Sequence, residues 1–164
     1  MKYLKLSLIV ICLLTAVQIS AAQDRTFGLG IILGEPTGLS AKLWTSQTNA
    51  FDFGLGWSEG SDRIGNYNGY YDGGSRVHFH MDYLWHAFNA ISSTERFPVY
   101  YGFGGRLNSG AGYNSSLAAR GVIGIAWMPH KTPIDVFVEL VPTLQLTNST
   151  GFTIEGGLGA RYYF

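Results

Sequence analysis

The sequence is poor in charge, in cysteine and in long apolar runs, and these shortages exclude several classes of protein. Only 13% of its 164 residues are charged, whereas a typical soluble domain has about 25%. Disordered chains combine high charge with few aromatic residues, but 15% of this chain is aromatic. Its 11 basic and 11 acidic residues leave no positive field that would attract nucleic acid.

The single cysteine, Cys12, lies in a segment typical of a secretory signal peptide, residues 1–22. Lys2 and Lys5 give it a positive start, an apolar stretch follows, and it ends in small residues. The apolar stretch is short for a membrane anchor, which needs about 20 residues. We expect the segment to be removed, which would leave residues 23–164 as one exported domain without a disulfide.

After this segment the hydrophobic pattern has a period of two, which is typical of strands with two different faces. The 22 glycines argue against a helical bundle, and no later run is long enough for a spanning helix. In the last segment, Phe152, Ile154 and Leu158 alternate with Glu155 and Arg161. The pattern predicts eight strands at 25–34, 37–45, 51–58, 76–86, 97–108, 117–128, 135–147 and 152–164.

Gly, Pro and Asn cluster between these segments and predict the connections. The longest predicted connection is 58–74, and Pro98 and Pro142 fall inside strand patterns, where a bulge would accommodate them. The other predicted connections are 35–36, 46–49, 87–96, 108–116, 129–133 and 147–151.

The two faces differ in size, and this difference predicts which one points outward. One face carries large Phe, Tyr, Trp, Leu and Ile side chains in every strand, while the other carries Gly, Ala, Ser and a few charges. Eight strands enclose a space just wide enough for side chains to fill. The large face therefore fits outside, against lipid, and we expect an eight-stranded antiparallel up-and-down transmembrane β-barrel. The alternative is a soluble lipocalin-like barrel with the faces exchanged.

A signal peptide and an even strand number point to the bacterial outer membrane, with both chain ends in the periplasm. This orientation places the longest connection, 58–74, outside the cell. It also gathers aromatic residues at both interfaces. Trp57 is expected near the outer interface, and the periplasmic set is Trp85, Trp127, Tyr162 and Phe164.

The closing strand resembles the C-terminal signal of outer-membrane β-barrels, because it ends in Phe164 with Tyr162 two residues before. Together with the leader and the eight alternating segments, it makes residues 23–164 similar to the small eight-stranded barrels of the OmpA/OmpX type. The hairpin from Gly34 to Lys42 also resembles one in an uncharacterised outer-membrane barrel family. The resemblance implies that barrel-assembly machinery recognises the last strand, with periplasmic chaperones assisting.

The inward face is expected to carry five bases and five acids, and buried charges of opposite sign need one another. We expect Arg161 and Glu155 on the last strand and Glu139 on the strand before to join a polar ladder that plugs the lumen. A gated pore whose ion pairs exchange partners is the alternative. The expected charges are Lys42, Arg76, Arg106, Arg120, Arg161, Asp52, Asp82, Asp135, Glu139 and Glu155.

His78, His80 and Asp82 alternate along one predicted strand, so their side chains point the same way. They are candidates for a metal site, although membership of the lumen hydrogen-bond network is the simpler interpretation. The sequence predicts neither a metal nor a cofactor. It also predicts no enzyme, because no His-x-Ser pair of the lipid A deacylase kind and no HExxH or GxSxG motif occurs.

The predicted external loops offer an adaptable contact surface of Tyr, Asn and Gly. Tyr67, Tyr70 and Tyr71 belong to the longest loop, and Tyr113 belongs to the next external one. We therefore expect a structural or adhesin-like surface role, with outer-membrane lipid and an unidentified extracellular ligand as partners. A narrow ion channel and a lipid-modifying enzyme are the alternatives.

Overall fold

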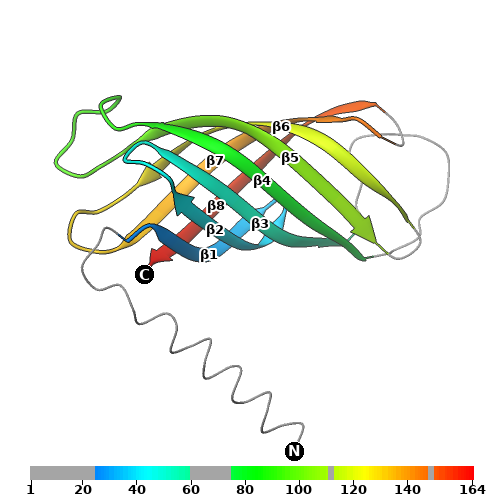
Figure 1. Cartoon of the computed structure of the whole chain (residues 1–164), viewed down its shortest axis with the longest axis horizontal. Coiled ribbons are helices and arrows are strands. Elements are labelled where there is room, and N and C mark those ends of the chain that lie inside the picture. Colours follow the sequence, from blue (N-terminus) through cyan, green and yellow to red (C-terminus); the bar gives the residue numbers. More distant parts are fainter. Residues whose placement is uncertain (1–24, 60–74, 111–112, 148–149) are drawn as a thin grey trace, which may run out of the picture.

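The described residues form one closed antiparallel β-barrel (Figure 1). The computed structural model describes residues 25–59, 75–110, 113–147 and 150–164. The strands are β1 (Phe27–Gly34), β2 (Thr37–Trp44), β3 (Asn49–Glu59), β4 (Ser75–Ala87), β5 (Val99–Gly110), β6 (Tyr113–Trp127), β7 (Ile134–Gln145) and β8 (Gly151–Tyr163).

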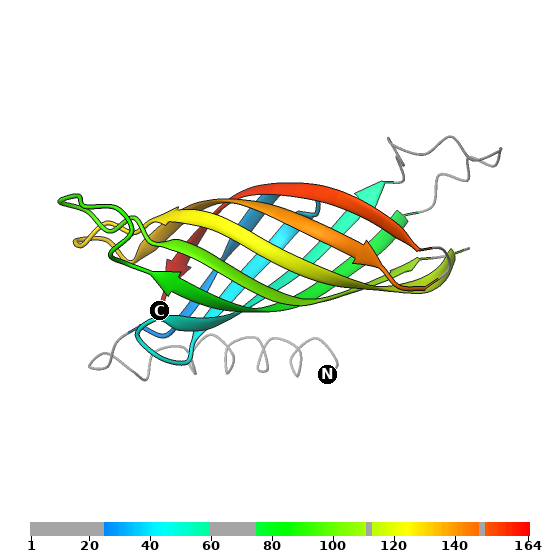
Figure 2. The ribbon, with the colours of Figure 1, turned by 90° about the horizontal axis from the view of Figure 1, so that it is seen from above.

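Each strand pairs with the strands before and after it in sequence, and β8 pairs with β1 to close the ring. The predicted eight-stranded up-and-down barrel is therefore confirmed. Figure 2 shows the strands crossing the long axis of the barrel obliquely, as closure of so few strands requires. No helix among the described residues is long and apolar enough to cross a bilayer. The proposed signal peptide, residues 1–22, lies outside the described residues.

The predicted connection 108–116 is wrong, because the β5–β6 ladder continues through most of it. Asn108 pairs with Ser116, and after a shift in register Gly110 pairs with Tyr113. Additional ladder hydrogen bonds satisfy backbone groups that a loop would leave to solvent. The small residues of this stretch had suggested a loop, but they are tolerated in a strand that has paired neighbours.

The predicted bulges at the two prolines are also wrong. Pro98 lies just before β5, where its carbonyl accepts a hydrogen bond from Ala126 N at 3.0 Å. Pro142 lies within β7 and pairs with Ile154 without any change of register. Proline cannot donate a ladder hydrogen bond. The β6–β7 ladder is accordingly interrupted next to Pro142, but the residue pairs on both sides of the interruption have the same register.

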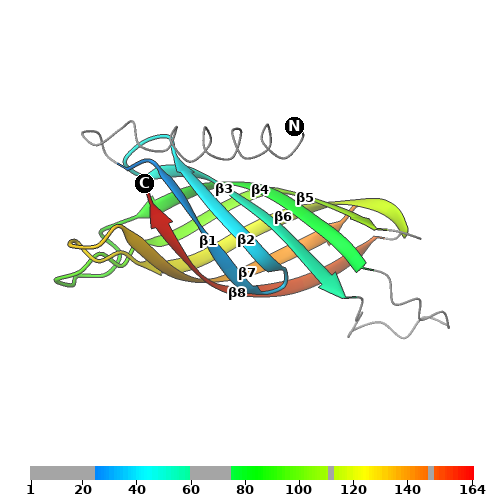
Figure 3. The ribbon, with the colours of Figure 1, turned by 90° about the horizontal axis from the view of Figure 1, so that it is seen from below.

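The β1–β2 hairpin is shorter than the rest of the wall, as Figure 3 shows. Its two strands have 8 residues each, whereas β6 has 15. Gly34 has a φ of 128°, a value that favours glycine. Its N–H donates to Thr37 Oγ1 at 3.2 Å, and that hydroxyl donates to Gly34 O at 3.0 Å. The turn is therefore fixed by its own residues.

Glycines in the wall make room for large rings inside the barrel. A Cβ built at any of three inward glycines would overlap a ring from a neighbouring strand. Small and large residues therefore face each other on neighbouring strands, so that the rings fit into the narrow interior. The pairs are Gly124 with Tyr100, Gly159 with Phe137, and Gly54 with His80.

Large apolar side chains cover the outside of the barrel. Their exposed fractions run from 38% at Leu43 to 67% at Ile154, so the wall is apolar where a water-soluble barrel is polar. On β3 to β5 the outer aromatic rings contact one another, with centroids 4.9 to 6.2 Å apart. This aromatic surface comprises Phe51, Phe53, Tyr83, Trp85, Tyr101 and Phe103.

The two ends of the barrel differ in what they carry. The C-terminal mouth is the end where β8 finishes and where the β2–β3, β4–β5 and β6–β7 turns lie (Figure 1). The four aromatic residues predicted for one interface all lie toward this end, and Trp57 lies toward the opposite end, opposite Thr37. The set at the C-terminal mouth is Trp85, Trp127, Tyr162 and Phe164.

Candidate functional site in the barrel lumen

Charged side chains fill much of the barrel interior. Those that the structure describes are each at most 9% exposed. Arg76 lies in β4 as expected, but its side chain is outside the described part. The buried set is Lys42, Asp52, His78, His80, Asp82, Arg106, Arg120, Asp135, Glu139, Glu155 and Arg161.

One group of these residues, the Arg161 cluster, lies toward the C-terminal mouth. Arg161 Nη2 lies 2.7 Å from Asp52 Oδ1, and its Nη1 lies 3.3 Å from Asp135 Oδ2. Arg161 Nε donates to Ser40 Oγ at 2.8 Å. Lys42 Nζ lies 3.8 Å from Asp135 Oδ2. The cluster therefore balances two cations with two carboxylates, which is what burial of charge requires.

His86 and Tyr163 complete this cluster, although the sequence had given them no role. Tyr163 Oη donates to Asp135 Oδ2 at 2.7 Å, and His86 Nε2 lies 3.2 Å from Lys42 Nζ. The alternation of side chains along each strand placed both residues on the inward face. Their partners lie on other strands, so the sequence pattern carried no signal for these contacts.

A second group, the Arg120 cluster, lies farther from the C-terminal mouth. Arg120 Nη2 lies 3.3 Å from Asp82 Oδ2, and its Nη1 lies 3.9 Å from Glu155 Oε2. Arg106 forms an ion pair with Glu155. His78 Nε2 lies 3.4 Å from Arg120 Nη1. Two guanidinium groups thus face two carboxylates, an arrangement suited to planar bidentate contacts.

The single ladder that we expected from Arg161, Glu155 and Glu139 is divided in the structure. Arg161 stacks its guanidinium over the ring of Phe137 at 3.9 Å and pairs with the acids of its own cluster. Glu155 pairs with the arginines of the other cluster. Glu139 accepts a hydrogen bond from Tyr100 Oη at 3.0 Å. Glu139 is therefore bonded to a phenol rather than to a guanidinium.

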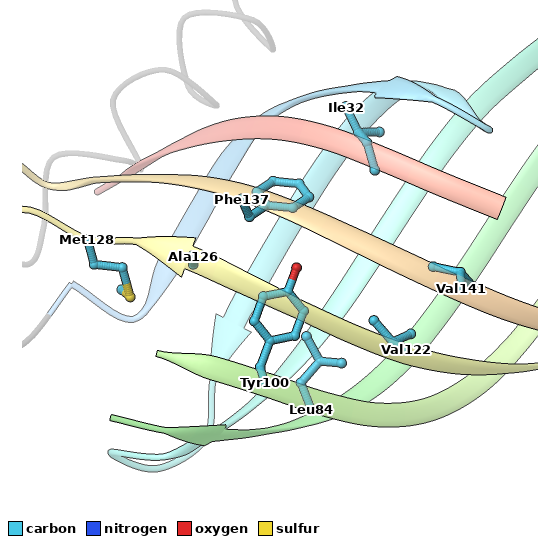
Figure 4. Packing of buried hydrophobic residues seen from close by; sticks show 8 residues of the cluster. All are labelled: Ile32, Leu84, Tyr100, Val122, Ala126, Met128, Phe137 and Val141. Atoms are coloured by element: carbon cyan, nitrogen blue, oxygen red, sulfur yellow. The ribbon is translucent and has the colours of Figure 1, made fainter. Parts of the chain in front are cut away.

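Apolar side chains also project into the lumen, and the sequence reasoning had given them no part in filling it (Figure 4). Tyr100, Leu84, Phe137 and Val141 are each at most 1% exposed. Phe137 and Val141 share the parity of Asp135 and Glu139 on β7, which was the signal that could have placed them inside. Packed apolar side chains therefore occupy part of the lumen beside the ion pairs. The full cluster is Ile32, Leu84, Tyr100, Val122, Ala126, Met128, Phe137 and Val141.

The two lumen histidines bond to each other, with His78 Nε2 2.9 Å from His80 Nδ1. Their rings meet edge to face at 5.2 Å. His80 Nε2 lies 3.9 Å from Asp82 Oδ2. No group of three metal-ligating side chains placed to hold an ion occurs within the described ranges. These contacts support the hydrogen-bond network as the role of both histidines.

Several buried polar atoms of the lumen have no hydrogen-bond partner within the described protein. In the Arg120 cluster they include Asp82 Oδ1, Arg106 Nε and Arg120 Nε, and Asn108 Oδ1 lies on the same strand as Arg106. Buried polar atoms of this kind are ordinarily satisfied by water. Asp135 Oδ1 of the Arg161 cluster is a further such atom, so both charge clusters contain them.

The predicted contact surface of the external loops is only partly covered by the structure. Tyr67, Tyr70 and Tyr71 lie outside the described residues. Tyr113 begins β6 instead of belonging to a loop, because that strand starts earlier than expected. The proposed assembly residues Tyr162 and Phe164 both point outward, with exposed fractions of 46% and 47%.

Two turns at the C-terminal mouth are fastened to each other. The backbone N–H of His130 donates to Glu95 Oε2 at 2.9 Å, and the His130 ring lies 3.1 Å from the same oxygen. The bridge between Arg96 and Met128 adds a backbone hydrogen bond of 2.9 Å. The two hydrogen bonds from His130, the backbone one above all, lower the pKa of the exposed Glu95 carboxyl below its ordinary value.

This link is expected to weaken in acid. A lowered pKa in the folded state gives a stabilising contribution that is present above the unfolded pKa and is lost as pH falls through the folded value. A carboxyl-detected NMR titration should therefore give Glu95 a midpoint below that of an unstructured glutamate. The variant His130→Ala should raise the midpoint only in part, because its backbone N–H remains. A wild-type midpoint at the ordinary glutamate value would contradict this.

Comparison of the chain with models of protein families, with curated proteins and with solved structures finds no match.

Proposed function

We propose that the protein is an integral outer-membrane β-barrel of a Gram-negative bacterium, similar in type to the small barrels of the OmpA/OmpX kind. The observation that carries this proposal is the reversed polarity of the wall. Lys42 and Asp135 are 0% exposed inside the barrel, whereas Phe152 and Ile154 are 66% and 67% exposed outside it. Lipid-facing apolar residues and a polar interior are the distribution that membrane barrels have.

The outer surface would be costly in water. Large apolar side chains are exposed on all eight strands, and soluble monomers rarely expose contiguous apolar patches larger than a few hundred Å². In a bilayer the same surface is stabilised by contact with lipid. Closure of the barrel leaves no unpaired sheet edge there, which a bilayer also demands.

The closed lumen favours a structural or surface-interaction role. Two ion-pair clusters and the apolar cluster occupy the interior, and barrels of this size normally leave no aqueous channel. In this proposal residues 1–22 direct export and the last strand is read by barrel-assembly machinery. The external loops then meet an extracellular ligand.

Membrane insertion is tested by folding the purified protein in neutral detergent and in phospholipid vesicles. We expect a β-rich circular dichroism spectrum, gel migration that changes on boiling, and flotation with the vesicles. Folding in water without detergent, with no flotation, would contradict the proposal and make a soluble ligand carrier the better interpretation.

A narrow channel is the second candidate, and the polar atoms without protein partners in the Arg120 cluster favour it. We expect planar-bilayer recordings of the wild type to show no resolved steps of current, because the apolar cluster crosses the lumen. Steps that the conservative variant Glu155→Gln alters would instead support the channel. A variant at an outward position, Leu158→Val, serves as the control for insertion.

A further inference from the structure

The C-terminal mouth contains a cavity of about 1140 Å³, here named the vestibule. The β2–β3, β4–β5 and β6–β7 turns form its walls, together with residues just before β1. Figure 2 shows the two longer turns, 88–98 and 128–133, extending past the barrel wall at this end. The volume slightly exceeds the range of about 300–1,000 Å³ that is common for ligand pockets, so the vestibule has room for a small organic molecule.

Basic residues line the vestibule. They are Arg25, Arg96, Lys131 and His130, and the acid next to them is Glu95, which bonds to His130. Among the described residues, the arginines and lysine of the lumen all pair with carboxylates. The vestibule differs from the lumen because Arg25, Arg96 and Lys131 form no salt bridge within the described residues, whereas His130 bonds to Glu95.

These basic side chains come from three separate elements, and contacts link each element to its neighbours. The Arg96–Met128 bridge joins the β4–β5 turn to the β6–β7 turn. On the opposite wall, Arg25 Nη1 donates to Tyr163 O at 3.3 Å and lies 3.4 Å from Tyr162 Oη. A ligand that binds positive groups already held in place causes a smaller loss of conformational entropy than one that must first order free side chains.

Two aromatic rings also line the vestibule. Trp44 and Phe88 are both partly exposed, and their ring centroids lie 6.1 Å apart. Trp44 is backed by His86 at 4.4 Å, so its ring is supported from beneath. A flat ring of a ligand can stack on such a surface while its charged end reaches the cations.

We propose that the vestibule binds a soluble anion that carries both phosphate groups and a flat ring, as nucleoside phosphates do. Phosphate suits the site because guanidinium groups bind it through paired hydrogen bonds, and because Arg25, Arg96 and Lys131, which have no salt-bridge partner among the described residues, favour a ligand of high negative charge. Trp44 and Phe88 supply the face for the ring. The site uses the turns of the barrel and does not depend on the external loops.

The test is calorimetric titration of the purified protein, folded in neutral detergent, with magnesium-free ATP, pyrophosphate and adenosine. ATP should bind most tightly, and its affinity should fall as salt is added. The double variant Arg96→Gln/Lys131→Gln should raise the Kd for ATP at least tenfold. Trp44→Ala should weaken the binding of ATP while leaving the affinity for pyrophosphate nearly unchanged. This comparison distinguishes the contribution of the ligand's ring from that of its phosphates.

The matched control is Arg76→Gln, which removes one positive charge at the opposite end of β4 and should leave the Kd unchanged. Boiling-dependent gel migration checks that each variant has folded. Equal Kd values for the wild type and the double variant would overturn the site. Pyrophosphate binding as tight as ATP would overturn the role of the ring, and adenosine binding as tight as ATP would overturn the role of the phosphates.

Discussion

Replacing Arg161 by methionine is expected to lower the free energy of unfolding by about 3–5 kcal/mol, because it leaves buried acids without a cation. Arg161 is 2% exposed and forms ion pairs with Asp52 and Asp135. Methionine occupies a similar volume but supplies no charge, so the loss comes mainly from those two carboxylates. Lys42 remains beside Asp135 and compensates only in part.

Urea titration of the protein in phospholipid vesicles, followed by tryptophan fluorescence, measures this loss. Arg161→Lys should lose less stability than the methionine variant, because it keeps the positive charge. It should still be less stable than the wild type, because it lacks the paired hydrogen bonds of the guanidinium group. Arg25→Gln, an exposed arginine at the same end, is the matched control and should change stability by less than about 1 kcal/mol. A methionine variant as stable as this control would show that the cluster does not need its central cation.

The second large effect is expected from Gly159→Val, which should destabilise the barrel by about 1–3 kcal/mol through overpacking. A Cβ at this position would overlap the Phe137 ring. Phe137 is 1% exposed and supports the Arg161 guanidinium at 3.9 Å. The ring therefore cannot move aside without disturbing the charge cluster.

A double-mutant cycle separates this clash from a general loss of strand stability. Phe137→Leu alone should be destabilising, because it removes packed volume. The combination Phe137→Leu/Gly159→Val should be less harmful than the sum of the two, since the smaller side chain relieves the overlap with the ring, although the contact with Ile31 O at 2.6 Å remains. Strict additivity would contradict the steric explanation. Gly151→Val is the control, because nothing lies within 4 Å of a Cβ there.

The alternation predicted the strands and their faces because each depends on neighbours within one segment. The last segment shows this well, since Glu155 and Arg161 are buried while Ile154 and Leu158 are exposed, as their parity requires. Which charged residues pair with each other was harder to predict from the sequence. Which carboxylate meets Arg161 depends on the register of strands far apart in the chain, and on the Phe137 ring that directs its guanidinium.

Local amino-acid composition led to wrong predictions where strand pairing, rather than composition, determines the structure. The run from Asn108 to Ser116 has the Gly, Ser and Asn content of a loop, yet pairing with a neighbour keeps most of it in β5 and β6. Pro142 suggested a bulge, but β8 pairs with it in regular register. The vestibule was not predicted, because its cations come from turns that only closure of the barrel brings together.

If the barrel lies in a membrane, as we propose, the short β1–β2 hairpin has a consequence for the surrounding lipids. Strands of 8 residues measure about 26 Å along their length, and at a tilt of about 40° they span roughly 20 Å. The apolar band of such barrels is about 25 Å tall. In the proposed membrane location, lipids beside this hairpin would have to shorten or tilt to avoid hydrophobic mismatch, while those beside β6 would not. One side of the molecule would then lie in a thinner bilayer than the other.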